Sequence, residues 1–163
     1  MTPRFTLDPV DETFFRTAPL TWRFVVDLAA GPDDVWAGLT ARRPLSWCRM
    51  LTDVQFAGTG PYDETSTRIA EVGKIVTLHE QFFRWSDTDR RHSFYVTESN
   101  LPVFRSFAED YQVVPTSTGS RLIWTFAIVP RRGFGPALRL NRVLFASLAA
   151  DTRRHFGKPP ITA

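Results

Sequence analysis

Residues 107–129, FAEDYQVVPTSTGSRLIWTFAIV, contain the pattern that decides the fold of this chain. Two runs rich in β-branched and aromatic residues, 107–115 and 120–129, flank a short polar segment at 116–119. This arrangement is typical of two β-strands joined by a turn. So short a connection requires antiparallel pairing, because a parallel crossover needs about a dozen residues or more.

The register of this hairpin follows from its loop, which places Pro115 opposite Ser120. In that register one face of the pair is mainly apolar and the other is mainly polar. An apolar sheet face has to be covered by a second layer of secondary structure. The predicted inner face consists of three cross-strand pairs: Glu109 with Phe126, Tyr111 with Trp124, and Val113 with Leu122.

The preceding strand, residues 92–99, is expected to pair with residues 107–115 through a loop at 100–105. An odd register keeps the apolar positions of the two strands together, whereas a shift by one residue mixes apolar with polar positions. The preferred register gives three inner pairs: Phe94 with Val113, Val96 with Tyr111, and Glu98 with Glu109.

The pairing of Glu98 with Glu109 is the sharpest chemical feature of the sequence. Two ionised carboxylates about 5 Å apart repel by about 3 kcal/mol at an effective dielectric of about 20. One interpretation is a polar anchor in an apolar cavity that also acts as a general acid or base, with Tyr111 beside it. The alternative is a solvated pair at the sheet edge, or a pair neutralised by Arg105.

Four further strands are predicted at 21–28, 54–57, 66–72 and 74–85, separated by segments that contain turn residues. The strand at 74–85 has two mixed faces, so its inner side is ambiguous. We place the first of two sets inside: Leu78, Glu80 and Phe82 rather than Gln81, Phe83 and Trp85.

Helices are expected at two places along the chain, after the first strand and after the last. Gly31-Pro32-Asp33-Asp34 begins a short one, because proline suits a first helical turn and carboxylates complement the helix dipole there. A second short helical turn is expected within 44–50. One long amphipathic helix runs from Pro136 to Gly157. Its apolar side includes three residues expected to face the sheet: Asn141, Leu144 and Leu148.

Asn141 is unusual on this apolar side. Two interpretations carry equal weight: its amide hydrogen-bonds a ligand across a cavity, or it bonds a loop carbonyl as a structural residue.

Several segments, in this order, resemble the START-like (SRPBCC) superfamily, and within it the bacterial polyketide cyclase/dehydrase and lipid-transport branch. They are AGPDDVW at 30–36, LSW at 45–47, GSRLIWTF at 119–126 and the terminal helix. The resemblance covers residues 19–157. It implies an α+β helix-grip fold, in which a curved antiparallel sheet of about seven strands wraps around the C-terminal helix, with two short helices after the first strand.

The resemblance also implies a cavity between sheet and helix that holds a lipid, a polyketide or a similar small hydrophobic molecule. We therefore expect a carrier or sensor, with two alternatives: a cyclase or dehydratase that uses Glu98, Glu109 and Tyr111, and a structural domain with a filled core. The family supplies no invariant catalytic set. The predicted ligand-binding residues are Phe82, Phe94, Val96, Glu98, Glu109, Tyr111, Trp124, Phe126, Asn141, Leu144 and Leu148.

Composition narrows the class of protein. At 163 residues, 43% apolar and 23% charged, the chain fits a single globular domain, residues 19–163, preceded by an N-terminal arm, residues 1–18. No apolar run is long enough for stable membrane insertion, and the first residues do not form a secretory signal. Cys48 is the one cysteine, which favours a cytoplasmic location.

No cofactor, metal ion or nucleic-acid partner is expected. The chain has no glycine-rich phosphate loop, and its net charge of +3 is small. His79 and His92 have no Cys or carboxylate at ligand spacing.

Overall fold

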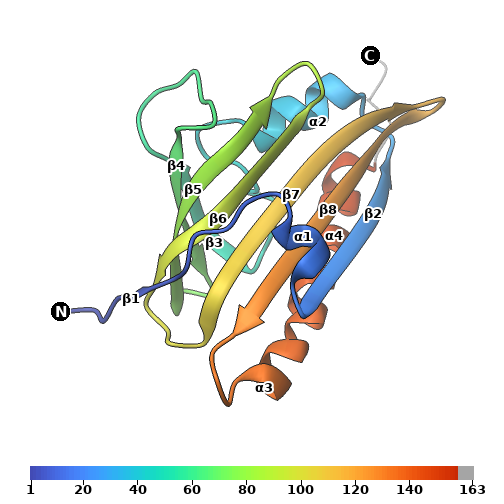
Figure 1. Ribbon diagram of the computed structural model, residues 1–163. Helices are drawn as coiled ribbons and strands as arrows, with labels where there is room; N and C mark the ends of the chain where they lie inside the picture. Colours follow the sequence, from blue (N-terminus) through green and yellow to red (C-terminus); the bar gives the residue numbers. More distant parts are fainter. Residues whose placement is uncertain (158–163) are drawn as a thin grey trace.

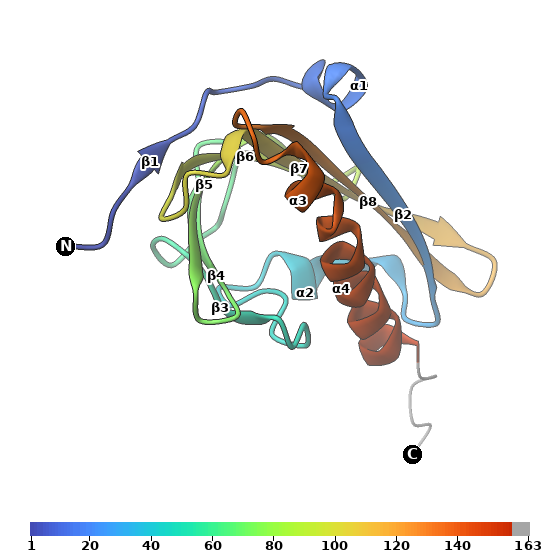
Figure 2. The same cartoon turned by 90° about the horizontal axis from the view of Figure 1, so that it is seen from below.

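The computed structural model describes residues 1–157 and shows a curled antiparallel sheet that wraps around the C-terminal helices (Figures 1 and 2). The strand order is β2-β8-β7-β6-β5-β4-β3, with β1 added beside β6. This arrangement confirms the predicted helix-grip fold. The strands are β1 (Phe5–Thr6), β2 (Leu20–Leu28), β3 (Leu51–Phe56), β4 (Thr67–Val72), β5 (Val76–Ser86), β6 (Arg91–Ser99), β7 (Phe104–Thr116) and β8 (Gly119–Pro130).

The helices are α1 (Phe14–Thr17), α2 (Pro32–Leu39), α3 (Gly135–Arg139) and α4 (Asn141–Phe156). Two details of the prediction were wrong. Residues 44–47 form the expected turn, but it does not extend into the second short helix that the resemblance implies. The C-terminal helix is divided at Leu140, where the N–H groups of Leu140 and Val143 bond to carbonyls three residues earlier and tighten the chain.

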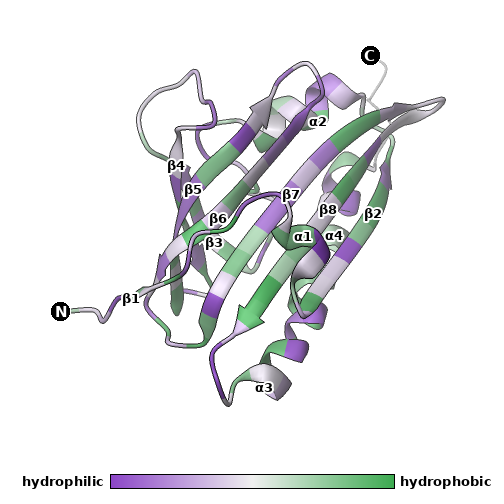
Figure 3. Cartoon of the chain, in the orientation of Figure 1, coloured by the Kyte–Doolittle hydropathy of each residue, from purple (hydrophilic) through white to green (hydrophobic). Residues whose placement is uncertain are grey.

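The β7–β8 hairpin has the predicted register, with Tyr111 opposite Trp124 and Pro115 opposite Ser120. Apolar and polar residues alternate along its strands in Figure 3, and the apolar set faces the helices. Tyr111, Trp124, Leu122 and Phe126 are fully buried there. Burial of these aromatic side chains is the main term that holds the sheet against α4.

The predicted register of β6 with β7 was wrong by four residues. Phe94 pairs with Glu109, and His92 pairs with Tyr111. In the paired stretch, the predicted inward-facing residues of the two strands still lie on the same face, because a shift of four residues preserves the two-residue period. The shift arises because β7 begins at Phe104, earlier than predicted, which shortens the connecting loop.

Two β-bulges change which face a residue occupies on β5 and β6. His79 pairs with Glu98 but Glu80 pairs with Val96, so Thr97 is an extra residue of β6. Phe83 is the extra residue of β5.

The bulge in β5 explains the ambiguity of that strand. Leu78, Glu80 and Phe82 are buried on the inner face, as predicted. Beyond the bulge the alternation shifts by one residue. Trp85 therefore also faces inward, where it packs against Trp36 and His92.

The N-terminal segment crosses the outer face of the sheet (Figure 1). Its strand β1 pairs with the end of β6, and Leu7 is 2% exposed. Phe14 packs against Ala108 and Ala127, which belong to the outer face of β7 and β8. The segment thereby shields part of the sheet surface that α4 does not cover.

Gly119 begins β8 at a point where two backbones nearly touch. A Cβ atom on Gly119 would lie 2.1 Å from the carbonyl oxygen of Leu28 and 2.8 Å from that of Ala29. We expect Gly119→Ala to lower the free energy of unfolding by about 3 kcal/mol, since backbone atoms would have to move. Urea denaturation measures this change. Gly31→Ala, where only the Asp34 side chain is near, should change it by less than about 1 kcal/mol.

Candidate functional site

A cavity of about 270 Å³ lies between the inner face of the sheet and the helices α3 and α4. This volume is close to the lower end of the range for small-molecule sites. Most of its lining is aliphatic or aromatic, with a few polar side chains that come from β4, β5, β7 and α4. Six of the residues predicted to bind ligand line it: Glu109, Tyr111, Trp124, Asn141, Leu144 and Leu148.

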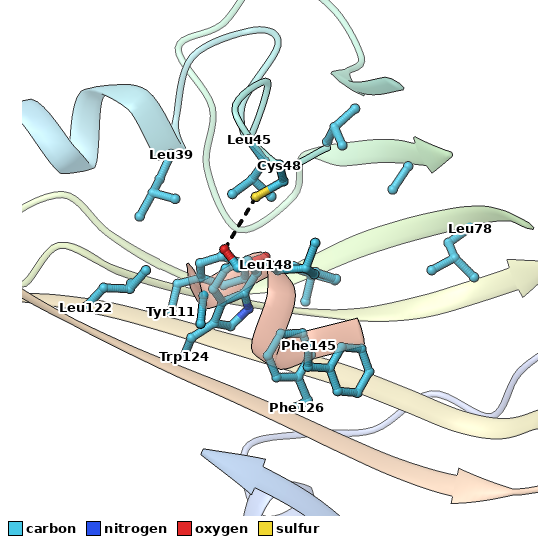
Figure 4. Close-up of a cluster of buried hydrophobic side chains, with 14 of the residues drawn as sticks. Leu39, Leu45, Cys48, Leu78, Tyr111, Leu122, Trp124, Phe126, Phe145 and Leu148 are labelled. Atoms are coloured by element: carbon cyan, nitrogen blue, oxygen red, sulfur yellow. Dashed lines mark hydrogen bonds between the residues drawn. The ribbon is translucent and has the colours of Figure 1, made fainter. Parts of the chain in front are cut away.

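Four other predicted residues, Phe82, Phe94, Val96 and Phe126, are buried in the core but do not line the cavity. The ring of Phe145 stacks on Phe126, with centroids 3.9 Å apart, and covers it. Figure 4 shows this stacked pair from β8 and α4 beside Trp124 and Leu148. Phe145 of α4 therefore lines the cavity where Phe126 of the sheet was predicted to contact a ligand.

Glu109 is held in the cavity wall by the two aromatic residues nearest to it. Its Oε2 accepts a hydrogen bond from the Tyr111 hydroxyl at 2.8 Å and another from the Trp124 indole N–H at 3.0 Å. Sheet geometry explains the cluster. Tyr111 is two residues beyond Glu109 on the same strand, and Trp124 is the cross-strand partner of Tyr111. No described residue donates a hydrogen bond to Oε1 of Glu109, so this oxygen is available to a ligand.

The environment of Glu109 raises the pKa of its carboxyl group. Burial, followed by repulsion from the Glu80 carboxylate, raises the pKa of Glu109 to about 7. The hydrogen bonds from Trp124 and Tyr111 and the charge of Arg68 oppose this rise. Near neutral pH the carboxyl group therefore exists in both forms, so it can donate or accept a proton.

A buried ion pair, Arg68–Glu80, forms the polar end of the same cavity. The Arg68 Nε donates to Glu80 Oε2 at 2.5 Å, and the side chains are 2% and 3% exposed. Burial raises the pKa of Glu80, and the Arg68 charge opposes that rise. The guanidinium also lies 4.5 Å from the ring centre of Phe94, which stabilises a desolvated cation.

Our sequence analysis missed Arg68 as a site residue, although a signal was present. Arg68 shares its strand face with Ala70 and Val72, and Glu80 shares its face with Leu78. Opposite charges on two apolar faces that are joined by a tight turn indicate a cross-strand ion pair. Arg68 and Glu80 are indeed direct cross-strand partners.

The predicted pairing of Glu98 with Glu109 was wrong. The bulge at Thr97 turns Glu98 to the outer face, where it lies beside the N-terminal segment. Its carboxylate is 3.2 Å from Arg4 Nη1, and its side chain is 35% exposed. Arg105, the partner considered in the alternative, pairs with Asp8 instead. Glu80 is the second carboxylate near Glu109.

Asn141 lines the cavity at the start of α4. Its side chain makes no hydrogen bond to any residue of the described part of the chain, so the predicted bond to a loop carbonyl is not present there.

His92 is fully buried among Trp36, Phe82, Trp85 and Tyr111, and neither ring nitrogen is hydrogen-bonded to another side chain of the described residues. Burial, reinforced by the Arg68 charge, holds the pKa of His92 well below its usual value. Within residues 1–157 no group of three or more His, Cys, Asp or Glu side chains is arranged to hold a metal ion.

Cys48 is buried against α4, where its thiol is 3.7 Å from the Leu148 carbonyl (Figure 4). Burial raises the pKa of the Cys48 thiol to about 12. The thiol is therefore protonated at neutral pH and is a poor nucleophile.

The sequence matches a known family over residues 6–155, described as polyketide cyclase/dehydrase and lipid transport. The chain belongs to this family. Uncharacterized proteins of Mycobacterium tuberculosis and Mycobacterium bovis are 32% identical to it over 133 residues, which cover 81% of this chain and 79% of theirs.

Two solved structures show the same fold. A START superfamily protein from Mycobacterium smegmatis has a TM-score of 0.70 at 11% identity, over 83% of this chain and 96% of its own. Major latex-like protein 151 from Panax ginseng has a TM-score of 0.62 at 17% identity, over 84% and 98%. Family and fold together indicate a domain that binds hydrophobic ligands. The described residues include no helix long and apolar enough to cross a bilayer.

Proposed function

We propose that this protein is a carrier or sensor of a small hydrophobic ligand, which it holds between the sheet and the helices α3 and α4. The observation that carries this proposal is the cavity of about 270 Å³ with a mainly apolar lining. A filled core would leave no such space, because protein interiors pack about as densely as organic crystals. We place this activity in the cytoplasm, since the one cysteine is an unpaired thiol.

The polar groups of the cavity indicate how the ligand is oriented. Glu109 directs a free carboxyl oxygen inward, and the half-buried Asn141 amide lines the opposite, helical side. Below pH 7 the protonated Glu109 can donate a hydrogen bond to a carbonyl or hydroxyl oxygen. This arrangement favours a neutral, oxygen-bearing hydrophobic molecule, whose apolar body contacts the aliphatic lining.

Filling the cavity should weaken ligand binding. Leu144 lines the cavity, whereas Ala150 of the same helix is exposed and does not line it. We expect Leu144→Trp to weaken binding of the neutral probe N-phenyl-1-naphthylamine by about tenfold or more, since overpacking costs 1–3 kcal/mol. Probe fluorescence measures the affinity. Ala150→Trp should stay within about twofold of the parent protein.

Native mass spectrometry of freshly purified protein provides the second readout. A co-purified small molecule should be present on the parent protein and on Ala150→Trp, and absent from Leu144→Trp. If both variants melt like the parent and bind the probe equally well, the cavity is not the binding site.

One observation favours a second candidate function, an enzyme of the cyclase or dehydratase type. Glu109 has a pKa of about 7, faces the cavity and is hydrogen-bonded to Tyr111, so it can act as a general acid or base. Glu98, predicted as its catalytic partner, lies outside the cavity and takes no part in this proposal.

Glu109→Gln separates the two candidates, with Glu98→Gln as the matched control. A dehydratase with Glu109→Gln should retain a bound molecule heavier by one water than the molecule on the parent protein, because it cannot complete the elimination. A carrier should hold the same molecule in the parent and both variants. Mass spectrometry of the organic extract distinguishes these outcomes.

A further inference from the structure

Apart from Met1, the three most exposed of the large apolar side chains described gather at the open end of the cavity. Among residues 1–157, and apart from Met1, the three most exposed large apolar side chains are Ile75, Leu140 and Val143, at 72%, 72% and 73%. A protein of this size exposes single apolar residues anywhere on its surface. Their restriction to one end is what requires an explanation.

Each of these residues is next in sequence to the cavity wall. Ile75 lies in the turn between β4 and β5, beside the lining residue Val76. Leu140 joins α3 to α4, between the lining residues Leu138 and Asn141. The view from below in Figure 2 shows α3, the start of α4 and the β4–β5 hairpin around this end of the molecule.

The same end carries cations without carboxylate partners. Lys74, Arg132, Arg139 and Arg142 are exposed, and none forms an ion pair with a described residue. No Asp or Glu occurs between residues 131 and 150. Of the acidic residues in this region, Asp8 pairs with Arg105, whereas Glu71 accepts a hydrogen bond from Thr52 and forms no ion pair with a described residue.

We propose that this surface, the mouth rim of Ile75, Leu140 and Val143 with Lys74, Arg132, Arg139 and Arg142, docks reversibly on an anionic lipid bilayer. Aliphatic side chains flanked by arginine and lysine suit the membrane interface, where chains enter the acyl boundary and cations meet lipid phosphates. The mode is peripheral and needs no helix that crosses the membrane.

Other partners fit the mouth rim less well. A stable dimer buries about 800 Å² on each partner around an apolar centre, and three separated aliphatic side chains supply too little. Single-stranded nucleic acid needs aromatic platforms between its cations, and the rim has none. A bilayer adapts to scattered side chains, so it is the occupant that the chemistry favours. Docking there would direct the cavity toward the lipid phase, whatever the ligand is.

Vesicle co-sedimentation tests the proposal with the full chain. We expect binding to vesicles of phosphatidylcholine with phosphatidylglycerol, little binding to phosphatidylcholine alone, and loss of binding at high salt. Each cation near an anionic surface contributes about fivefold in affinity. Arg139→Glu with Arg142→Glu should therefore weaken binding by about 25-fold or more.

A control with the same change of net charge separates local from overall electrostatics. Arg23→Glu with Arg153→Glu alters two exposed cations away from the mouth rim and should retain binding within about threefold. On the apolar side, Leu140→Ser should weaken binding, whereas Ile69→Ser, on the outer face of β4, should not.

Three outcomes would overturn the proposal. The first is equal binding to both kinds of vesicle, and the second is equal loss of binding in both charge-reversed pairs. The third is an absence of vesicle binding together with a concentration-dependent dimer that Leu140→Ser dissociates, which would assign the rim to a second copy of the chain. None depends on the cavity holding a ligand, so the carrier proposal is tested separately.

Discussion

Arg68→Met is expected to lower the free energy of unfolding by about 3–5 kcal/mol at pH 8, because it leaves the Glu80 carboxylate buried without its cation. The two side chains are 2% and 3% exposed and 2.5 Å apart, so bulk water does not take the place of the lost cation. Loss of the guanidinium also removes its contact with the Phe94 ring. Chemical denaturation measures the loss directly.

The double variant Arg68→Met/Glu80→Leu provides the control, since replacing both partners by apolar residues is often neutral or stabilising. We expect it to unfold within about 1 kcal/mol of the parent protein, which gives a large coupling energy in the double-mutant cycle. The single variant should also become more stable as the pH falls, because a protonated Glu80 is cheaper to bury. A single variant that loses less than about 1 kcal/mol would show that the pair is not desolvated.

Glu109→Gln is expected to become more stable relative to the parent protein by about 3 kcal/mol as the pH rises from about 4.5 to 8. In the parent, the pKa of Glu109 is about 7 in the folded state and near 4.5 in the unfolded chain. Between these values the folded state binds more protons, so its stability is lost as the pH rises. Glutamine keeps an acceptor for Tyr111 and Trp124 but does not titrate.

The variant has to be compared with the parent, because titration of His92 changes the free energy of unfolding with pH in the opposite direction to that of Glu109. Its pKa is well below the usual value, so the unfolded chain binds the extra proton and stability rises with pH up to about 6.5. The two effects cancel in part in the parent protein. Subtracting the parent curve from that of Glu109→Gln isolates Glu109. A difference that does not vary with pH would contradict a raised pKa for this residue.

Among the site residues, those of the β7–β8 hairpin were the most predictable. A four-residue turn determines one register, so the proximity of Glu109, Tyr111 and Trp124 follows from strand parity alone. The hydrogen bonds that join them are a direct result of this proximity.

Glu98, the site residue that sequence analysis placed on the wrong face, lies where an irregular backbone intervenes. Strand parity predicted Glu98 on the inner face, but the extra residue Thr97 places it on the outer face. A bulge leaves no periodic signal, because it consists of one residue that interrupts the period. The sequence likewise shows no cause for the break at Leu140, which places an exposed leucine at the end of the cavity.

What the sequence determined by itself is local: strands by their two-residue period, helix ends by proline and glycine, and one hairpin by its short turn. Only the tertiary structure decided that Arg68 and Glu80 share a dry site, that Glu109 titrates near neutral pH, and that a hollow remains beneath α4. The physical reason is that burial and leftover volume depend on how whole layers approach one another. Neighbouring residues specify the layers, whereas the distance between layers arises from all the side chains together.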